Sequence, residues 1–266
     1  TGYLQLIRFT QNGSAPISLN LAGNTTAYLG PNSSFGGNFT LSADNIWAQG
    51  ATYNGTATFT KTGGTNNHNQ GYQNIFNSTC EIIQQSSGGY FMLGYNSNDL
   101  FNDNIIVNST GSGGIYLGYS SGTGTPTLAA GKTVSIGSAG FSSGFLHFGS
   151  FTQLGNAAIN LSMTGTAALY IRYANSNSVF GGAFTASAAD VYVQGGTFNS
   201  PASFTKTGGS SNHNNGYQNI YNSTLSINQQ SSSGYFMLGY NSNDLFNDDI
   251  TVTESGSSGI YLGYPS

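Results

Sequence analysis

Charged side chains are scarce in this sequence. Its 266 residues include only 5 Lys and Arg and 9 Asp and Glu, for a formal net charge of -4. The basic side chains are spread along the whole chain, at Arg8, Lys61, Lys132, Arg172 and Lys206. Because nucleic-acid binding and attraction to an anionic membrane both need clustered positive charge, we expect neither.

Long hydrophobic runs are missing as well. No apolar stretch approaches the roughly 20 residues that a membrane-spanning helix needs, so we expect no membrane insertion. No signal peptide opens the chain, and because it begins at Thr1 rather than at methionine, we expect a processed or excised piece of a longer protein.

Cysteine occurs once, at Cys80, which excludes an internal disulfide. Leu225 occupies the equivalent place in the second copy of a repeat described below, so Cys80 is interpreted as a small buried apolar residue. Although charge is low, 17 Tyr and 17 Phe supply enough apolar area for an ordered core. Abundant Gly, Asn, Ser and Thr with few Lys and Glu is typical of secreted fibrous proteins, and we expect an extracellular or cell-surface location.

A long internal repeat dominates the sequence. The segment GYFMLGYNSNDLFND at 89–103 recurs unchanged at 234–248, an offset of 145. Upstream of Phe35 the offset is 142, which places a three-residue insertion near Ala174 to Ser178. The chain is therefore one continuous unit, 1–266, in which 1–119 and 143–264 are two copies and 120–142 is an intervening coil.

A shorter repeat lies inside each copy. Apolar anchor residues follow Asn-rich turns at a spacing of roughly 18–27 residues, typical of one solenoid coil. They are Phe35, Tyr53, Phe76, Phe101, Leu128, Leu154, Phe180, Phe198, Tyr221 and Phe246. Two short runs with period-two alternation follow each anchor, such as 105–107 and 115–117. Strands this short are stable only when equivalent strands stack above and below them. The sequence predicts an all-β fold, a parallel β-solenoid (β-helix) of about ten coils, with right-handed winding.

Identical side chains are expected to stack between coils. Asn32, Asn98, Asn177 and Asn243 each precede an anchor phenylalanine by three positions and are candidates for an asparagine ladder. Asparagine also tolerates left-handed turn geometry, so turn formation alone is the alternative explanation.

The acidic residues cluster in one kind of turn only. Asp99 and Asp103 lie in the first copy, and Asp244 and Asp248 lie at the same places in the second. Since a unique active site has no need of duplication, we interpret these carboxylates as turn residues and expect no catalytic residues, no enzyme activity and no required cofactor. Oxygen-rich turns can also hold calcium, so the four aspartates remain calcium candidates, although their spacing matches no EF-hand loop and the chain lacks the glycine-rich aspartate nonapeptide of secreted β-rolls.

The outward positions of the second strand in each coil carry aromatic or other large side chains. If Ile115 and Leu117 point inward, Tyr116 points outward. The same alternation yields a predicted ligand-binding or partner-binding set, the aromatic stripe, made of Tyr28, Trp47, Met92, Tyr116, His147, Tyr170, Tyr192, Met237 and Tyr261. Aromatic faces suit sugar rings or partner proteins, and the alternative role is a ladder that stabilises the sheet.

The first strand of each coil carries a row of small polar residues. Its predicted members are Thr40, Thr60, Ser135, Asn160, Thr185, Thr205, Ser226 and Thr251, with Glu81 and Ile106 as interruptions. Regular threonine rows are typical of ice-binding solenoids, which makes an ice-binding surface a third functional alternative.

The coil FNDNIIVNSTGSGGIYLGYSSGTGTP, residues 101–126, resembles in its cadence the large repetitive β-solenoid surface proteins of Bacteroidetes. The resemblance covers essentially the whole chain and includes no catalytic motif. It implies an exported adhesin or surface fibre, often of the type IX-exported type, and no functional residues can be transferred from it.

Together these observations predict a structural or adhesive shaft segment of a large extracellular repetitive surface protein or fibre. The expected partners are sister chains or further tandem repeats of the same protein, and surface glycans. A glycan-binding or glycan-cleaving β-helix module is the main alternative.

Overall fold

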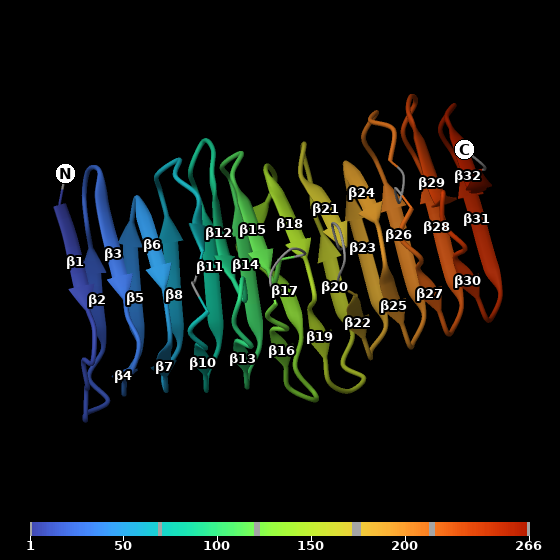
Figure 1. Cartoon of the computed structure of the whole chain (residues 1–266). Helices are drawn as coiled ribbons and strands as arrows, with labels where there is room; N and C mark the ends of the chain where they lie inside the picture. The colour runs from blue at the N-terminus through green and yellow to red at the C-terminus, as the bar shows by residue number, and fades with distance from the viewer. Residues whose placement is uncertain (1, 69–70, 120–122, 172–176, 213–215, 265–266) are drawn as a thin grey trace.

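The chain forms a parallel β-solenoid of about 11 turns, as predicted (Figure 1). The computed structural model describes residues 2–68, 71–119, 123–171, 177–212 and 216–264. Every pair of strands among them is parallel, and each coil stacks on the one before it. Within this part of the chain there is no helix, and so none that could span a membrane. Right-handed winding remains a prediction.

The first side of the solenoid, the long-strand wall, is an unbroken 11-stranded sheet. Its strands are β2 (Ile17–Asn20), β5 (Phe39–Ala43), β8 (Ala57–Lys61), β11 (Cys80–Gln84), β14 (Ile105–Ser109), β17 (Val134–Phe141), β20 (Ile159–Ser162), β23 (Phe184–Ala188), β26 (Ala202–Lys206), β28 (Leu225–Gln229) and β31 (Ile250–Glu254).

The second side, the anchor wall, is a ten-stranded sheet of very short strands. They are β4 (Ser33–Phe35), β7 (Ala51–Tyr53), β10 (Ile75–Phe76), β13 (Leu100–Phe101), β16 (Thr127–Leu128), β19 (Thr152–Gln153), β22 (Ser178–Phe180), β25 (Gly196–Phe198), β27 (Ile220–Tyr221) and β30 (Leu245–Phe246).

The third side, the aromatic wall, is divided into three sheets. The first contains β1 (Gly2–Leu6), β3 (Thr25–Leu29) and β6 (Asn45–Ala48). The second contains β9 (Asn67–His68), β12 (Tyr90–Leu93), β15 (Gly114–Leu117), β18 (Phe145–Phe148), β21 (Ala168–Ile171) and β24 (Asp190–Val193). The third contains β29 (Tyr235–Tyr240) and β32 (Gly259–Tyr264).

Most coils thus have three strands, whereas the sequence predicted two. The two predicted runs became the strands of the long-strand and aromatic walls. The anchor residues, expected to precede the strands, form strands themselves. These anchor strands are too short to show a period of two.

The anchor side chains point inward and stack along the solenoid axis. The rings of Phe35, Tyr53, Phe76 and Phe101 follow one another at centroid distances of 5.2, 4.9 and 4.9 Å, and the planes of successive rings differ by at most 11°. A second stack runs from Phe180 through Phe198 and Tyr221 to Phe246 at 5.2, 5.2 and 5.3 Å. The predicted stacking of aromatic rings inside the coils is therefore confirmed.

Leu154 was wrongly predicted as an anchor. It is 49% exposed, and Gln153 occupies the core position beside Leu128. The buried amide of Gln153 donates from Nε2 to the Ala157 carbonyl at 2.7 Å and accepts at Oε1 from the Gly182 amide at 3.2 Å. Glutamine is tolerated here because both of its polar atoms are satisfied by the backbone of the following turn.

Equivalent residues of the two copies occupy the same wall. Phe101 and Phe246 both lie on the anchor wall and both pack against the core, although Phe246 is only partly buried because it belongs to the last coil. Most of the predicted insertion near Ala174 to Ser178 lies outside the described residues.

The predicted asparagine ladder was placed at the wrong position. Asn32 adopts left-handed geometry with a φ of 61°, in line with a turn role, and asparagine ladders lie instead directly after three anchors of each copy. Asn77 Nδ2 donates to Asn54 Oδ1 at 2.8 Å, and Asn102 Nδ2 donates to Asn77 Oδ1 at 2.9 Å. The second copy has the same ladder through Asn199, Asn222 and Asn247. The middle amide of each ladder donates to the preceding coil and accepts from the next, so each ladder joins three coils.

Candidate functional site on the aromatic wall

The aromatic wall holds every residue of the predicted stripe at one position of its strands. Met92, Tyr116, His147, Tyr170 and Tyr192 are direct partners in successive strands. Tyr28 pairs with Trp47 at the N-terminal end, and Met237 pairs with Tyr261 at the C-terminal end. The shared register follows from the alternation that buries Ile115 and Leu117 on either side of Tyr116.

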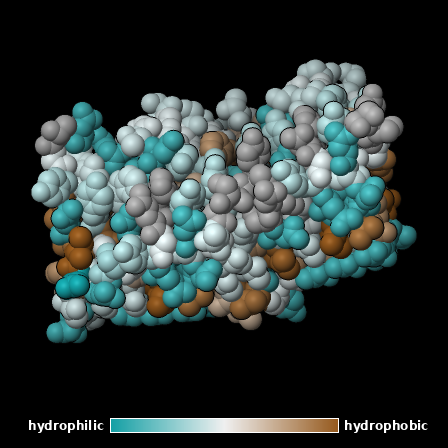
Figure 2. All heavy atoms as spheres, in the orientation of Figure 1, coloured by the Kyte–Doolittle hydropathy of each residue, from teal (hydrophilic) through white to brown (hydrophobic). Residues whose placement is uncertain are grey.

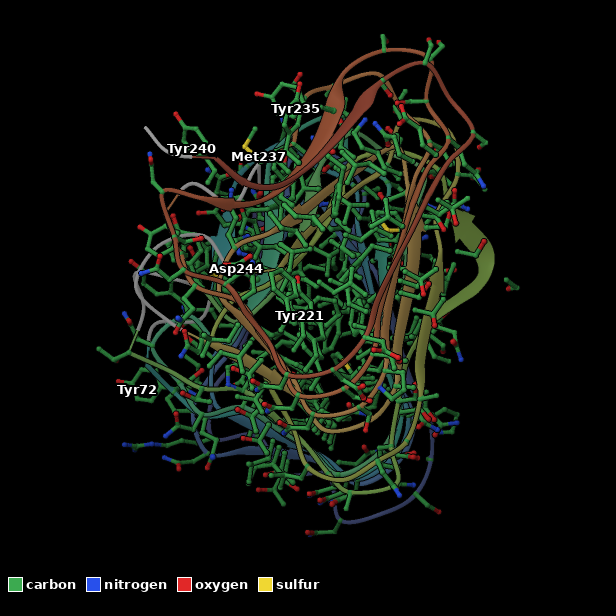
Figure 3. The ribbon with its side chains drawn as sticks, turned by 90° about the vertical axis from the view of Figure 1, so that its right-hand side faces the viewer. Tyr72, Tyr221, Tyr235, Met237, Tyr240 and Asp244 are labelled. Carbon is green, nitrogen blue, oxygen red and sulfur yellow. The ribbon has the colours of Figure 1, made fainter. Side chains whose placement is uncertain are left out.

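The stripe is not uniformly exposed, which corrects the expectation of a fully outward face. Met92 is 1% exposed, His147 3% and Met237 6%, whereas Tyr261 in the last coil is 42% exposed. The rings of Tyr116, Tyr119 and Tyr170 surround His147 at centroid distances of 4.6, 6.5 and 6.1 Å. Figure 3 shows Tyr235, Met237 and Tyr240 along the outside of one wall and Tyr221 inside the coil.

The stripe forms ring stacks in two places. Tyr170 and Tyr192 lie face to face at 4.6 Å with planes 1° apart, and Tyr28 and Trp47 lie at 6.1 Å with planes 23° apart. Burial raises the pKa of Tyr170 to about 12, with smaller contributions from Tyr192 and Asp190. Burial also raises the pKa of Tyr192, so both tyrosines stay neutral through the physiological range.

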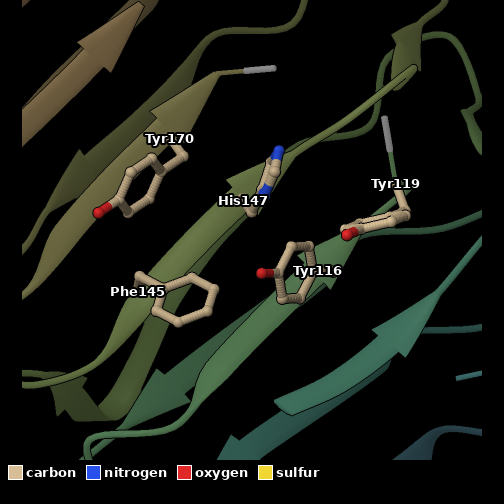
Figure 4. Close-up of a pocket in the computed structure, with 5 residues that line it drawn as sticks. All are labelled: Tyr116, Tyr119, Phe145, His147 and Tyr170. Carbon is tan, nitrogen blue, oxygen red and sulfur yellow. The ribbon is translucent and has the colours of Figure 1, made fainter. Parts of the chain in front are cut away.

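A pocket opens in the middle of the stripe, where the two copies of the repeat meet. Tyr116, Tyr119, Phe145, His147 and Tyr170 line a cavity of about 240 Å³ (Figure 4). The rings of Tyr116 and Phe145 meet edge to face at 5.2 Å, and those of Tyr116 and His147 lie 4.6 Å apart. None of the five side chains is charged at neutral pH.

Sequence reasoning missed two of these five residues. Phe145 pairs with Gly114, and a Cβ at position 114 would lie 2.1 Å from the Phe145 ring, so this glycine makes room for the ring. Tyr119 follows Gly118, whose positive φ of 81° turns the chain after β15. Its ring lies 5.5 Å from that of Tyr116. The sequence signal that could have revealed Phe145 is the glycine, Gly114, at the equivalent position of the preceding coil.

His147 is the polar group of the pocket. Burial lowers the pKa of its imidazole to about 3, so the ring is neutral at physiological pH. Its Nε2 atom is buried and has no hydrogen-bond partner among the described residues. A buried polar atom of this kind costs free energy unless another group satisfies it.

The carboxylates of the duplicated acidic turns hold the backbone of these turns in place. Asp99 is fully buried, and its carboxylate accepts hydrogen bonds from Ser97 Oγ at 2.8 Å and from the backbone amides of Asn74 and Gly94 at 2.8 and 2.9 Å. Burial raises its pKa to about 6, partly offset by these hydrogen bonds. Asp244 repeats the arrangement with Ser242, Asn219 and Gly239. Carboxylates surrounded by N–H and O–H donors are poorly placed to ligate a cation.

The other two calcium candidates lie near the surface. Asp103 forms an ion pair with Lys132 at 2.8 Å, which holds the pKa of Asp103 below its usual value. Asp248 accepts from the Asp249 amide at 2.8 Å. Among the described residues, no three His, Cys, Asp or Glu side chains form a group that could hold a metal ion.

The predicted threonine row divides into two rows on the long-strand wall. Thr40 pairs with Thr58, and Thr60 pairs with Ser42, because Phe59 between the two threonines points into the core. The predicted interruption is present, since Glu81 and Ile106 pair in adjacent strands. The threonines therefore do not form one continuous lattice.

Comparison with protein-family models, with curated proteins and with solved structures gave no match.

Proposed function

We propose that this chain is a structural or adhesive shaft segment of a large extracellular repetitive surface protein or fibre, and that it is not an enzyme. The observation that carries the proposal is the repetition of the structure from coil to coil, in which equivalent residues of the two copies lie on one wall and the anchor rings stack along the axis. Supporting features are the asparagine ladders and the extracellular type of composition.

The last coil exposes side chains whose counterparts in the first copy are buried. Val252 and Leu262 are 45% and 43% exposed, whereas Val107 and Leu117, their counterparts in the first copy, are 0% exposed. Figure 2 shows apolar side chains at the surface at both ends of the stack and along its lower edge between them. The partners that we propose for the shaft are sister chains or further tandem repeats of the same protein.

The adhesive part of the proposal concerns the aromatic stripe. With so few charges, electrostatic attachment is weak, whereas a buried aromatic side chain contributes on the order of 1–2 kcal/mol to an interface. Repetition along a shaft adds avidity, so weak contacts to surface glycans or sister chains hold firmly together.

Extending the shaft tests the structural part. A chain in which residues 120–264 are appended once more after residue 264 is expected to lengthen by about 30 Å, from roughly six added turns at ~4.8 Å each. The amides of β31 and β32 should then exchange more slowly in hydrogen-exchange measurements. The matched control carries Val252→Asp and Leu262→Asp in the extended chain. Independent folding of the added copy, without lengthening seen by small-angle scattering, would refute the proposal.

The alternative function is a glycan-cleaving enzyme, whose catalytic carboxylates would have to come from the acidic turns. Hydrolysis needs two carboxylates placed on either side of a glycosidic bond, and Asp99 and Asp244 are largely buried within their own hydrogen-bond networks. We expect no turnover of any polysaccharide. Turnover that disappears in Asp99→Asn, Asp103→Asn, Asp244→Asn or Asp248→Asn would establish the alternative.

A further inference from the structure

We propose that the pocket formed by Tyr116, Tyr119, Phe145, His147 and Tyr170 binds one neutral sugar ring, with the imidazole of His147 bonded to a ring hydroxyl. The proposal deepens the adhesive part of the proposed function and rests on it, since it names the ligand class of one point on the stripe. It is independent of the structural part.

The size and walls of the pocket set the class of ligand. A cavity of about 240 Å³ lies below the roughly 300–1,000 Å³ of sites for drug-sized ligands, so it suits a single small ring. Tyr116 and Tyr170 flank the site, and Phe145 lies between them at 5.2 and 5.7 Å. Such walls offer rigid apolar faces to the C–H groups of a pyranose and tyrosine hydroxyls to its oxygens.

The described lining of the pocket disfavours ionised ligands. No Lys, Arg, Asp or Glu is among the described residues that line it. A uronic acid, a sialic acid or a phosphate would lose hydration on entry without gaining an opposite charge. The ligands that fit the pocket are therefore neutral hexoses and their methyl glycosides.

His147 supplies the polar contact. Its neutral imidazole has one donor nitrogen and one acceptor nitrogen, and Nε2 is buried without a partner among the described residues. A sugar hydroxyl can both donate and accept, so it satisfies Nε2 in either tautomer once the rings that shield this buried atom move apart on binding. A purely apolar ligand of the same size would leave Nε2 unsatisfied.

The pocket exists once in the described chain because it combines the end of one copy with the start of the next. Tyr116 has its counterpart at Tyr261, in the last coil. The counterparts of Phe145, His147 and Tyr170 in the first copy are Tyr3, Gln5 and Tyr28, at the N-terminal end. Tyr72, which is 51% exposed, and its repeat counterpart Tyr217 belong to neither the stripe nor the pocket, which makes them suitable controls.

The test is a titration of the whole chain with methyl glycosides of neutral hexoses. Binding is measured from the NMR signals of the His147 imidazole and by calorimetry. We expect at least one glycoside to shift the His147 signals and glucuronic acid to leave them unchanged. Tyr170→Ala and Tyr116→Ala should each weaken binding about tenfold, the loss of one aromatic contact. Tyr72→Ala and Tyr217→Ala, at tyrosines outside both the stripe and the pocket, should bind as the unchanged chain does.

Several results would overturn the proposal. They are the absence of any shift with every glycoside, equal weakening in the control variants, or binding of phenol, a mimic of a partner protein's tyrosine, in place of the sugars. If a pocket variant fails to fold, the titration of the unchanged chain decides alone. Since the extension experiment measures rod length and not sugar binding, failure of the pocket proposal and failure of the shaft proposal are distinguishable.

Discussion

Tyr53 and Phe76 lie 4.9 Å apart with their ring planes only 5° from parallel, although they belong to different coils of the chain. Both rings are fully buried, and each stacks on the ring of another coil on its other face. The distance equals about one strand spacing, so the ring stack and the backbone ladder have the same repeat. Side-chain and backbone contacts therefore specify one register together.

The ring stack predicts a large effect of one core substitution. Phe76→Ala removes a fully buried ring between Tyr53 and Phe101 and leaves a cavity, so we expect the free energy of unfolding to fall by about 3–5 kcal/mol. Urea unfolding followed by circular dichroism measures it. Tyr3→Ala, at a residue that is 75% exposed, is the control and should change stability by less than about 0.5 kcal/mol. Equal effects of the two variants would contradict the stacked core.

Asp99 predicts a stability that falls as the pH rises from about 4 to about 7. Its pKa is about 6 in the folded chain against a usual 3.8, so the folded state holds the proton more tightly than the unfolded state does. The stabilising contribution is complete below pH 4 and is lost as the pH rises through 6, by up to about 3 kcal/mol. Asp99→Asn should flatten this part of the profile.

Asp103 provides the control of opposite sign. Lys132 lowers the pKa of Asp103, so its contribution is present above the usual pKa and is lost as the pH falls. Asp103→Asn should therefore remove a loss of stability below about pH 4 and leave the decline between about pH 5 and pH 7 unchanged. A profile that Asp99→Asn leaves unchanged would show that Asp99 is not buried as described.

Lys61 predicts a gain in stability on the alkaline side. Its ammonium group is buried, donates to the Asp44 carbonyl at 2.8 Å, and has a pKa lowered to about 8, chiefly by burial. Because the unfolded chain binds this proton more tightly, unfolding should cost more free energy as the pH rises from about 8 to about 9.5. Lys61→Met should reduce the rise, because burial also lowers the pKa of Lys206, its counterpart in the second copy, and Lys132→Met, at a partly exposed residue, should keep the full rise. A wild-type profile that falls over this range would contradict the assignment.

The sequence was sufficient for the fold class because repetition shows which residues are equivalent. The recurrence of residues 89–103 at 234–248 and the anchor spacing predicted a parallel solenoid with equivalent residues on one wall. The anchor strands were missed because strands this short carry no period. Leu154 was predicted as the anchor in place of Gln153 because leucine is the more hydrophobic residue. Only the structure shows that the Gln153 amide is satisfied by the Ala157 carbonyl and the Gly182 amide.

The candidate site was predicted in part. Alternation along the strands was enough to place Tyr116, His147 and Tyr170 in register. It could not show that His147 is covered by larger neighbours, because coverage depends on ring orientations on other coils. Nor could it show that Asp99 is buried, since an aspartate among Asn and Ser has the composition of a solvated turn.

The most direct test of the adhesive shaft changes Trp47, Tyr116, Tyr170, Tyr192 and Tyr261 together to Ser or Thr. Adhesion to glycans, to cells and to sister chains is measured beside the circular dichroism spectrum and the unfolding midpoint. The account predicts a variant that keeps its β-sheet spectrum and loses adhesion, because none of the five belongs to the buried hydrophobic core. A variant that folds and adheres as the unchanged chain does would contradict it, and the stripe would then be a structural ladder only.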